Sequence, residues 1–325
     1  MGNSIRIITE QEKRATASLL QLVLENPGCS IDTEYPQWLF GTNHITFGTL
    51  HGYPVVFKYF DWIPRKKQEE WALSVFAPTR LVPKLYPIQS ESIIVMERLR
   101  GSTLYVAEPN LQKDQLEAIY RQLGNAIANM VTMAPGATPG GNCGMLSVPG
   151  FDYEFFCQAS TGTLFDTVIK RSMRILTDHE VPDKVILIAS LERLQQCRDA
   201  ILAFPSLIQM DDFHKNNIMV CGSEVTGFID LEMTRYGNEV LVLAAALAAF
   251  GGIIDQWHWF RQGYEEKRGS VMGKDLFNLV CVAAPFTQWL RFMWYWTTEA
   301  QFLEEGEKTR EWPIRDIKAI VQKLS

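Results

Sequence analysis

The spacing of apolar side chains changes character near residue 100, and this change predicts two lobes. Before it, residues 10–24 have the periodicity of an amphipathic helix, and four stretches rich in β-branched and aromatic residues predict strands. A second helical stretch begins after Pro64 and ends before Pro78, because proline is tolerated in a first helical turn but not in a helix interior. The predicted strands are residues 37–40, 45–47, 53–60 and 92–96. Residues 1–97 are therefore expected to form a compact N-terminal lobe of strand pairs with one helix.

Residues 98–325 carry mainly helical periodicity. Apolar residues three and four positions apart over 111–133 are typical of a half-buried helix. Further helical patterns cover 164–176, 183–203, 240–250, 274–296 and 314–324, with short strands around 217–220 and 227–229. The segment 136–150 is rich in Gly and Pro and predicts a loop, and residues 97–101 are the natural hinge to the first lobe.

Charge and cysteine usage narrow the class of protein. A formal net charge of −6 argues against general binding to nucleic acid or to anionic lipid. The longest apolar run, residues 240–254, is too short to span a bilayer and suits a buried core helix. Six scattered cysteines without a C-x-x-C pair are typical of reduced thiols in a cytosolic protein. We therefore expect a cytoplasmic protein with no nucleic-acid or membrane partner. The sequence does not indicate an oligomeric state.

The residues that suggest chemistry lie in two polar segments beside predicted strands. Asp212 precedes Asn217 in Asp-Phe-His-Lys-Asn-Asn, and Asp230 follows in Phe-Ile-Asp-Leu-Glu. Phosphoryl transfer from a nucleotide requires a carboxylate to take the acceptor's proton, and an amide and a second carboxylate to hold Mg²⁺. In the apolar strand Val-Val-Phe-Lys-Tyr-Phe, Lys58 either reaches out to solvent or binds nucleotide phosphates. The spacing predicts Asp212 as the catalytic base or orienting carboxylate, with Asn217 and Asp230 as metal ligands.

These two segments resemble the catalytic core of the aminoglycoside phosphotransferase and choline kinase-like family. Its usual wording is H-G-D-[FL]-H-x-x-N followed by I-D-[FW]-E. The resemblance implies an α+β, bilobal, protein kinase-like fold, with a mainly antiparallel N-terminal sheet lobe with one helix, hinged to a mostly helical C-terminal lobe. It also implies ATP or GTP as the phosphate donor, Mg²⁺ as the cofactor and a hydroxyl group as the acceptor. His214 resembles the histidine that braces the catalytic loop in this family.

The resemblance extends to the nucleotide site. Lys58 would hold the α- and β-phosphates and pair with a glutamate of the next helix. Glu70 is preferred over Glu69 as that partner, because Glu70-Trp71-Ala72-Leu73 resembles the family's E-A-x-x-L. Thr42 and Asn43, in a loop between the first strands, would offer hydrogen-bond donors to phosphate.

The resemblance also covers the hinge and the residues that support the catalytic loop. Backbone groups of Glu97 and Leu99 would bind the nucleotide base, so side chains do not distinguish ATP from GTP. Three residues depart from the family: its histidine two positions before the catalytic aspartate is Met210 here, the glycine that follows is Asp211, and a second aspartate beneath the loop is Val242. Because a buried polar pair can be exchanged for an apolar pair when both members change, we expect packing to hold the loop.

A small hydroxylated acceptor is expected, with an aminoglycoside- or nucleoside-like antibiotic as the first interpretation and resistance by O-phosphorylation as the consequence. The alternatives are a metabolic kinase of the choline, homoserine or methylthio-sugar type, and a nucleotide-binding pseudokinase that regulates a partner. A protein kinase is not expected, because the chain after Asp230 leaves no room for an activation segment. The aromatic residues of 286–296 either pack in the core or line an acceptor pocket. Three acidic residues either bind a cationic acceptor or lie on a solvated helix surface: Asp255, Glu265 and Glu266.

Overall fold

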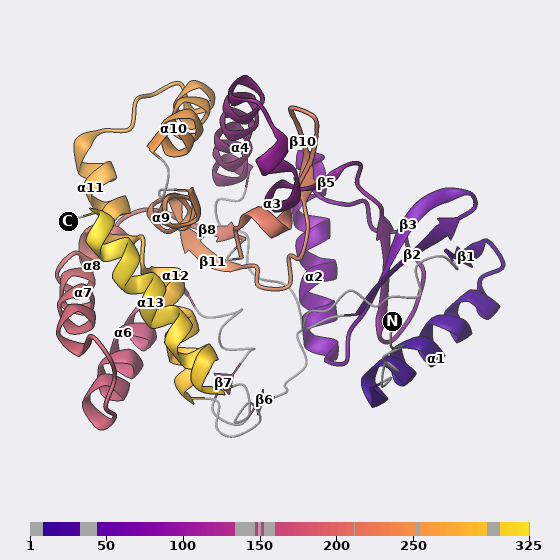
Figure 1. Ribbon diagram of the computed structural model, residues 1–325, viewed down its shortest axis with the longest axis horizontal. Coiled ribbons are helices and arrows are strands. Elements are labelled where there is room, and N and C mark those ends of the chain that lie inside the picture. The colour runs from indigo at the N-terminus through magenta and orange to yellow at the C-terminus, as the bar shows by residue number, and fades with distance from the viewer. Residues whose placement is uncertain are drawn as a thin grey trace, which may run out of the picture.

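The computed structural model describes residues 9–32, 44–133, 147–148, 151–152, 160–210, 212–250, 254–297 and 306–324. The predicted phosphate loop with Thr42 and Asn43, and the predicted strand 37–40, lie outside these described residues. Figure 1 shows the arrangement of the elements, with the N-terminal sheet and α1 (Glu10–Glu25) on one side of the molecule and most helices on the other.

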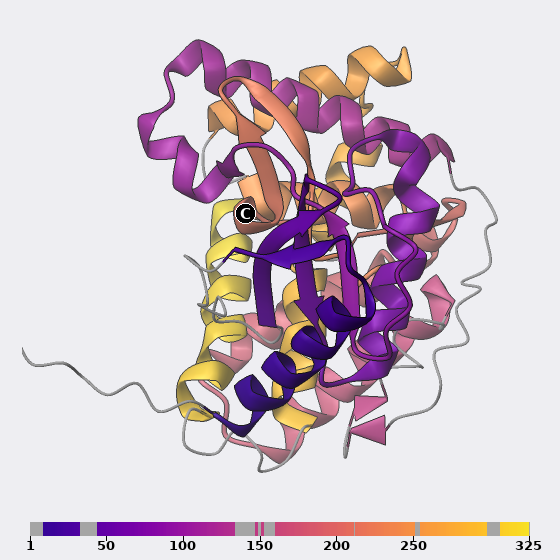
Figure 2. The ribbon, with the colours of Figure 1, turned by 90° about the vertical axis from the view of Figure 1, so that its right-hand side faces the viewer.

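The N-terminal sheet has four antiparallel strands in the order β1-β2-β3-β4. The strands are β1 (Cys29–Ile31), β2 (His44–Leu50), β3 (Tyr53–Tyr59) and β4 (Ile93–Glu97). Successive side chains of a strand point to opposite faces, so Phe57 and Tyr59 pack in the same apolar cluster as Leu19 and Leu22 of α1. Figure 2 shows α1 lying in front of this sheet. Lys58, between them in β3, faces the other side of the sheet.

The second face of the sheet is covered by α2 (Ile63–Phe76), which follows β3 directly. Its first turn contains Pro64, where the missing N–H costs no helical hydrogen bond. Ala72, Leu73 and Phe76 join Ile94 of β4 in the main hydrophobic core. This packing fixes α2 beside the strand that carries Lys58. A 3₁₀ turn, η1 (Ala77–Thr79), ends the helix at Pro78.

The rest of the chain is mostly helical and supports two small sheets. β5 (Ser102–Thr103), β9 (Ile218–Cys221) and β10 (Glu224–Phe228) form one sheet, and β8 (Ser206–Gln209) pairs with β11 (Arg235–Asn238). β6 (Ser147–Val148) pairs with β7 (Phe151–Asp152), inside and just beyond the predicted loop 136–150. The helical elements are α3 (Leu104–Ala107), η2 (Glu108–Asn110), α4 (Lys113–Met133), α6 (Thr161–Asp178), α7 (Lys184–Gln196), α8 (Arg198–Leu202), η3 (Lys215–Asn217), α9 (Glu239–Phe250), α10 (Ile254–Arg268), α11 (Lys274–Ala283), α12 (Phe286–Thr297) and α13 (Gly306–Leu324).

Helix α9 lies at the centre of the helical part and is apolar on all sides (Figure 1). Helices α4 and α10 pack side by side, and two glycines permit this close approach. A Cβ at Gly124 would lie 1.9 Å from the carbonyl oxygen of Phe260, and a Cβ at Gly263 would lie 1.9 Å from that of Arg121. Because backbone atoms cannot move aside as a flexible side chain can, only glycine fits at these two positions.

The fold class predicted from the sequence is confirmed: an antiparallel N-terminal sheet region is joined to a mostly helical C-terminal part. The helix predicted over 183–203 divides into α7 and α8 at Cys197, and that over 274–296 divides into α11 and α12 around Pro285. Helix α10 was not predicted. Among the described helices, none combines the length and the apolar character needed to cross a membrane.

Candidate active site

The described residues of the loop between β8 and β9 (210 and 212–217, the catalytic loop) lie around the carboxylate of Asp212. The side-chain amide of Asn217 donates to Asp212 Oδ2 and to the Asp212 carbonyl oxygen, each at 3.0 Å. His214 lies with Nε2 3.2 Å from Asp212 Oδ2, while its Nδ1 accepts from the backbone N–H of Asn216. His214 therefore braces the loop, as the resemblance implies.

Asp212 also receives a donor from a distant helix. Arg291 Nη2 of α12 lies 2.5 Å from Asp212 Oδ1, across 79 positions of sequence. Burial alone would raise the pKa of Asp212, but the His214 hydrogen bond, the Arg291 charge and the Asn217 hydrogen bond lower it below the ordinary aspartate value. The carboxylate is therefore ionised at neutral pH and held in one orientation.

The support of the catalytic loop is partly apolar and partly ionic. Met210, Phe213 and Val242 line the same small cavity beneath the loop. Their packing fits the expectation that apolar contacts replace the family's polar ones. Lys215 adds an ion pair, with Nζ 2.6 Å from Glu108 Oε2. Glu108 also accepts hydrogen bonds from the side chains of Tyr120 and Gln256, so it connects the loop to α4 and α10.

Asp230 lies directly after β10, where the chain is held on both sides. The N–H of Phe228 donates to Leu81 and that of Ile229 donates to Asn217, which brings the Asp230 segment beside the catalytic loop. Asp230 has φ of 62°, in the left-handed region that Asp tolerates better than most residues. Asp212, Asn217 and Asp230 line one narrow crevice.

Lys58 is buried among carboxylates. Its Nζ lies 2.5 Å from Glu69 Oε2, 2.6 Å from Asp230 Oδ1 and 3.9 Å from Glu232 Oε2. Burial opposes the lysine charge, but the carboxylates of Asp230, Glu69 and Glu232 outweigh it and raise the pKa of Lys58. Burial, together with the neighbouring carboxylates, raises the pKa of Glu69 above the ordinary glutamate value. The ammonium is therefore charged and links the N-terminal sheet to the Asp230 segment.

The predicted ion pair between Lys58 and Glu70 was wrong. Glu69 is 1% exposed and contacts Lys58, whereas Glu70 lies toward the surface with Oε1 2.6 Å from Lys66 Nζ. Adjacent residues of a helix point about 100° apart, so only one of the two glutamates can face the sheet. Gln68, which precedes Glu69, is also buried, and its side chain donates to the carbonyl oxygen of Thr234. This hydrogen bond fixes the rotation of α2.

The crevice suits a hard divalent cation. The Asn217 amide nitrogen is turned to Asp212, so its side-chain oxygen is on the opposite side and available as a ligand. Asp230 is 35% exposed and keeps a carboxylate oxygen beyond the one that contacts Lys58. One oxygen each of Glu69, Asp230 and Glu232 also lie within 4.8 Å of one another. The donor set consists of carboxylate and amide oxygens, which Mg²⁺ prefers.

At the end of β4, Glu97 uses its N–H to donate to the carbonyl oxygen of Lys84, 2.9 Å away. Leu99 lies with Cδ1 over Gly227 of β10, so this segment contacts the second sheet. The assignment of Glu97 and Leu99 to the nucleotide base stays a prediction.

Residues 61–269, close to two thirds of the chain, match the sequence model of the APH family, described as the phosphotransferase enzyme family. The chain belongs to this family. The match includes the Asp212 and Asp230 segments as well as α2, and it makes the protein a phosphotransferase of the kinase type. No curated protein matches the sequence at a significant level.

Several solved structures share the fold of this APH family member at low sequence identity. The aminoglycoside phosphotransferase APH(4)-Ia is similar with TM-score 0.66 and 12% identity, covering 95% of this chain and 99% of that chain. The macrolide 2'-phosphotransferase MphH from Brachybacterium faecium gives TM-score 0.65 and 17% identity, covering 92% and 97%. A choline/ethanolamine kinase family protein from Mesorhizobium loti gives TM-score 0.59 and 12% identity, covering 97% and 99%.

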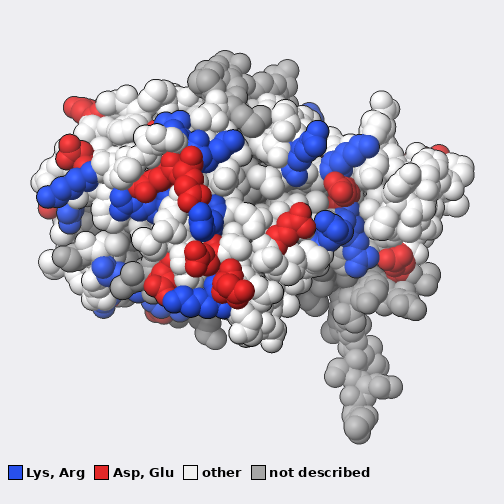
Figure 3. Space-filling view, turned by 90° about the horizontal axis from the view of Figure 1, so that it is seen from above, with Lys and Arg blue, Asp and Glu red and all other residues white. Residues whose placement is uncertain are grey.

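Sequence reasoning missed Arg291 and Glu108, which reach the catalytic loop from other parts of the chain. Neither lies in a motif, so no local signal identifies them. The acidic residues proposed for a cationic acceptor lie elsewhere and are paired: Asp255 with Lys113, Glu265 with Arg261, and Glu266 with Arg121. Figure 3 shows this face, where acidic and basic side chains lie next to each other.

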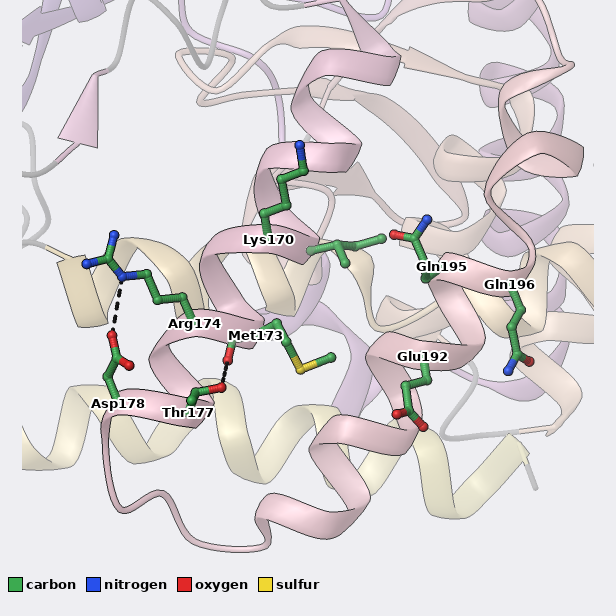
Figure 4. Close-up of a pocket in the computed structure, with 9 residues that line it drawn as sticks. Lys170, Met173, Arg174, Thr177, Asp178, Glu192, Gln195 and Gln196 are labelled. Carbon is green, nitrogen blue, oxygen red and sulfur yellow. Dashed lines mark hydrogen bonds and ion pairs between the residues drawn. The ribbon is translucent and has the colours of Figure 1, made fainter.

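A larger surface groove, of about 780 Å³, lies between α6 and α7. Figure 4 shows Arg174 and Asp178 paired on one side of it, opposite Glu192, Gln195 and Gln196. Its lining includes none of the candidate catalytic residues. The volume of this groove therefore does not make it the candidate site, whereas the carboxylate and amide groups of the Asp212 crevice support that crevice as the candidate active site.

Proposed function

We propose that this protein transfers the γ-phosphoryl group of Mg-ATP or Mg-GTP to a hydroxyl of a small molecule. The observation that carries the proposal is a series of contacts from Lys58 to Asp230, from the adjacent Ile229 to Asn217, and from Asn217 to Asp212. The residues in this series would serve as the phosphate-binding cation, the two metal ligands and the base that phosphoryl transfer requires. The N-terminal lobe, residues 1–97, and the C-terminal lobe, residues 98–325, would close on the nucleotide about the hinge.

In this proposal Asp212 orients the acceptor hydroxyl and receives its proton as the oxygen–phosphorus bond forms. The bond between the γ-phosphorus and the bridging oxygen breaks, and the nucleoside diphosphate leaves. A carboxylate with a lowered pKa suits this role, because the transition state is loose and the proton moves late. Asn217 and Asp230 would hold Mg²⁺, which neutralises charge on the phosphates. Lys58 would bind the α- and β-phosphates, with Glu69 as its partner in place of Glu70.

The acceptor class rests on similarity at the level of fold and family. One thermostable mutant of APH(4)-Ia was crystallised as a ternary complex with AMP-PNP and hygromycin B, and it is 11% identical to this chain with TM-score 0.67. We propose an aminoglycoside- or nucleoside-like antibiotic as the first class of acceptor, with resistance as the outcome. A metabolic alcohol of the choline, homoserine or methylthio-sugar type is the second class. The reaction would take place in the cytoplasm, where ATP and GTP are held.

A pseudokinase is the alternative from another class, motivated by Met210 and Val242. The contact of Lys58 with Asp230, and the position of Asp230 and Asp212 in the lining of one crevice, favour catalysis instead.

The test is phosphoryl transfer from Mg-ATP and Mg-GTP to a panel of aminoglycosides, nucleosides and amino alcohols, read by mass spectrometry. Asp212→Asn is the inactive variant, and Asp199→Asn, a change at an exposed carboxylate, is the matched control. A phosphorylated product that vanishes only in Asp212→Asn supports the proposal. Nucleotide binding without transfer to any acceptor would favour the pseudokinase, and absence of nucleotide binding would exclude both.

A further inference from the structure

Helix α12 presents two different faces. Trp289, Phe292 and Met293 are buried in the core, whereas Arg291 and Tyr295 are partly exposed. Residues four apart lie on the same side of a helix, so Arg291 and Tyr295 share the face that meets the catalytic loop. Helix α12 thus packs in the core on one side, and on the other side its Arg291 contacts Asp212 of the catalytic loop.

The Asp212 carboxylate has little room for a further donor. Oδ1 accepts from Arg291, and Oδ2 accepts from Asn217 and His214. A carboxylate offers about four lone-pair positions in all. An acceptor hydroxyl must therefore bind beside the Arg291 guanidinium on Oδ1, or displace it. In both cases a positive charge lies next to the carbon that carries the reacting hydroxyl.

The surroundings of Arg291 are aromatic and basic. Its guanidinium lies 5.1 Å from the centre of the Trp312 ring, and the rings of Tyr295 and Trp312 are 6.4 Å apart. Arg310 donates from Nε to the carbonyl oxygen of Tyr295, 3.3 Å away. Burial raises the pKa of Tyr295, and the charges of Arg291, Asp212 and Arg65 also act on it. Arg291 therefore lies over the Trp312 ring, and Arg310 contacts the backbone of Tyr295.

Two carboxylates that the structure describes near Arg291 and Arg65 already have cationic partners. Asp212 pairs with Arg291, and Glu232 contacts both Arg65 and Lys58. The acidic residues of α10 pair with basic residues on the outer face of α4 and α10 (Figure 3). Among the described residues, a polyammonium molecule would therefore have to compete with Arg291, Lys58 and Arg65 for these carboxylates.

We propose that the acceptor carries an anionic group, a carboxylate or a phosphate, beside its reacting hydroxyl, and that Arg291 binds this group while Tyr295 and Trp312 contact its ring. This inference rests on the proposed function and narrows its acceptor class away from polyammonium aminoglycosides. A guanidinium has five N–H donors in a planar fork, and the contact with Asp212 uses one. The fork can therefore hold Asp212 and a second oxyanion together, which an ammonium cannot do with the same geometry.

The test uses matched acceptors that differ only in charge, each offered with Mg-AMP-PNP in titration calorimetry and with Mg-ATP in a turnover assay. Three skeletons serve: glucuronate, glucose and 6-amino-6-deoxyglucose; 3-phenyllactate, its amide and 1-amino-3-phenylpropan-2-ol; and uridine 5'-carboxylate, uridine and 5'-amino-5'-deoxyuridine. Kanamycin represents the polyammonium class. The variants are Arg291→Met, Arg291→Glu and, as a control on the surface of α6, Arg174→Glu.

We expect the acid to bind about tenfold to a hundredfold more tightly than the amine on at least one skeleton, the effect of one charge-assisted contact. Arg291→Met should remove this preference, Arg291→Glu should invert it, and Arg174→Glu should leave it unchanged. Arg291→Met keeps the length of the side chain, so it tests the inference even where Arg291→Glu fails to fold.

Several results would overturn the inference. They are kanamycin or the amines binding as well as the acids, no preference on any skeleton, or a preference that persists in Arg291→Met. A different result would contradict the proposed function itself: a wild-type protein that does not bind Mg-AMP-PNP and transfers phosphate to no acceptor. A protein that binds Mg-AMP-PNP without preferring acids contradicts only the identity of the acceptor.

Discussion

Replacing Lys58 by Met tests the buried charge cluster that joins the two parts of the catalytic centre. The change keeps the apolar stem and removes the ammonium that contacts Glu69, Asp230 and Glu232. Glu69 is only 1% exposed, so water cannot replace the lost partner. Breaking a buried pair in this way costs about 3–5 kcal/mol, which lowers Tm by roughly 4–8 °C for a chain of this length.

Lys66→Met is the matched control. Lys66 is almost as buried, but its partner Glu70 is 32% exposed and can turn toward water. We therefore expect a loss of about 1 kcal/mol or less, the value of a partly exposed pair. The assay is thermal unfolding of both variants and the wild type at several pH values.

The pH dependence supplies a second check. The raised pKa of Lys58 means that its contribution in the wild type is fully present below the ordinary lysine pKa, and so throughout the neutral range. In Lys58→Met, burial raises the pKa of Glu69 without an opposing ammonium. A carboxylate whose pKa is higher in the folded state than in the unfolded state stabilises the protein at low pH. This contribution is lost as the pH rises through the pKa of the folded state. The gap between variant and wild type should therefore widen from pH 5 to pH 8. If the Lys58→Met and Lys66→Met variants had the same Tm at every pH, this reasoning would be refuted.

Three further changes test separate contacts. Glu69→Gln should lower kcat/KM for the nucleotide about tenfold, equivalent to about 1.4 kcal/mol, whereas Glu70→Gln should change it less than twofold. Equal effects of the two changes in steady-state assays would contradict the assignment of Glu69 as the partner of Lys58. Glu108→Gln removes the carboxylate that binds the lysine of the catalytic loop and should lower stability by about 1–3 kcal/mol in denaturant unfolding; an unchanged midpoint would show that the ion pair does not hold the loop. Val242→Asp places an unpaired carboxylate beneath Met210 and should cost about 3 kcal/mol or more; a rise in both stability and activity would contradict support by packing.

The sequence predicted the parts of the site that lie in short contiguous segments. Asp212 and Asn217 share one loop, and Asp230 follows the next hairpin, so their spacing along the chain nearly fixes their spacing in the structure. Lys58 was recognisable because a single lysine interrupts an apolar strand. These residues needed no knowledge of how the helices pack.

The remainder depends on contacts between distant segments. Arg291 is 79 positions from Asp212, and its role follows only from the packing of α12 against the loop. The choice between Glu69 and Glu70 depends on the rotation of α2, whose largely polar sequence gives a weak helical phase. Helix α10 escaped prediction because it packs on α4 through backbone contact at Gly263 rather than through a regular apolar stripe.

The most direct test of the account is a calorimetric titration of the protein with AMP-PNP in the presence and absence of Mg²⁺, for the wild type and for Asp230→Ala. The account predicts saturable binding that Mg²⁺ strengthens in the wild type, because Asn217 and Asp230, which line one crevice, would hold the cation beside the phosphates. In Asp230→Ala the strengthening by Mg²⁺ should disappear while the folded structure remains. Absence of nucleotide binding in the wild type, or an equal response to Mg²⁺ in both proteins, would contradict it.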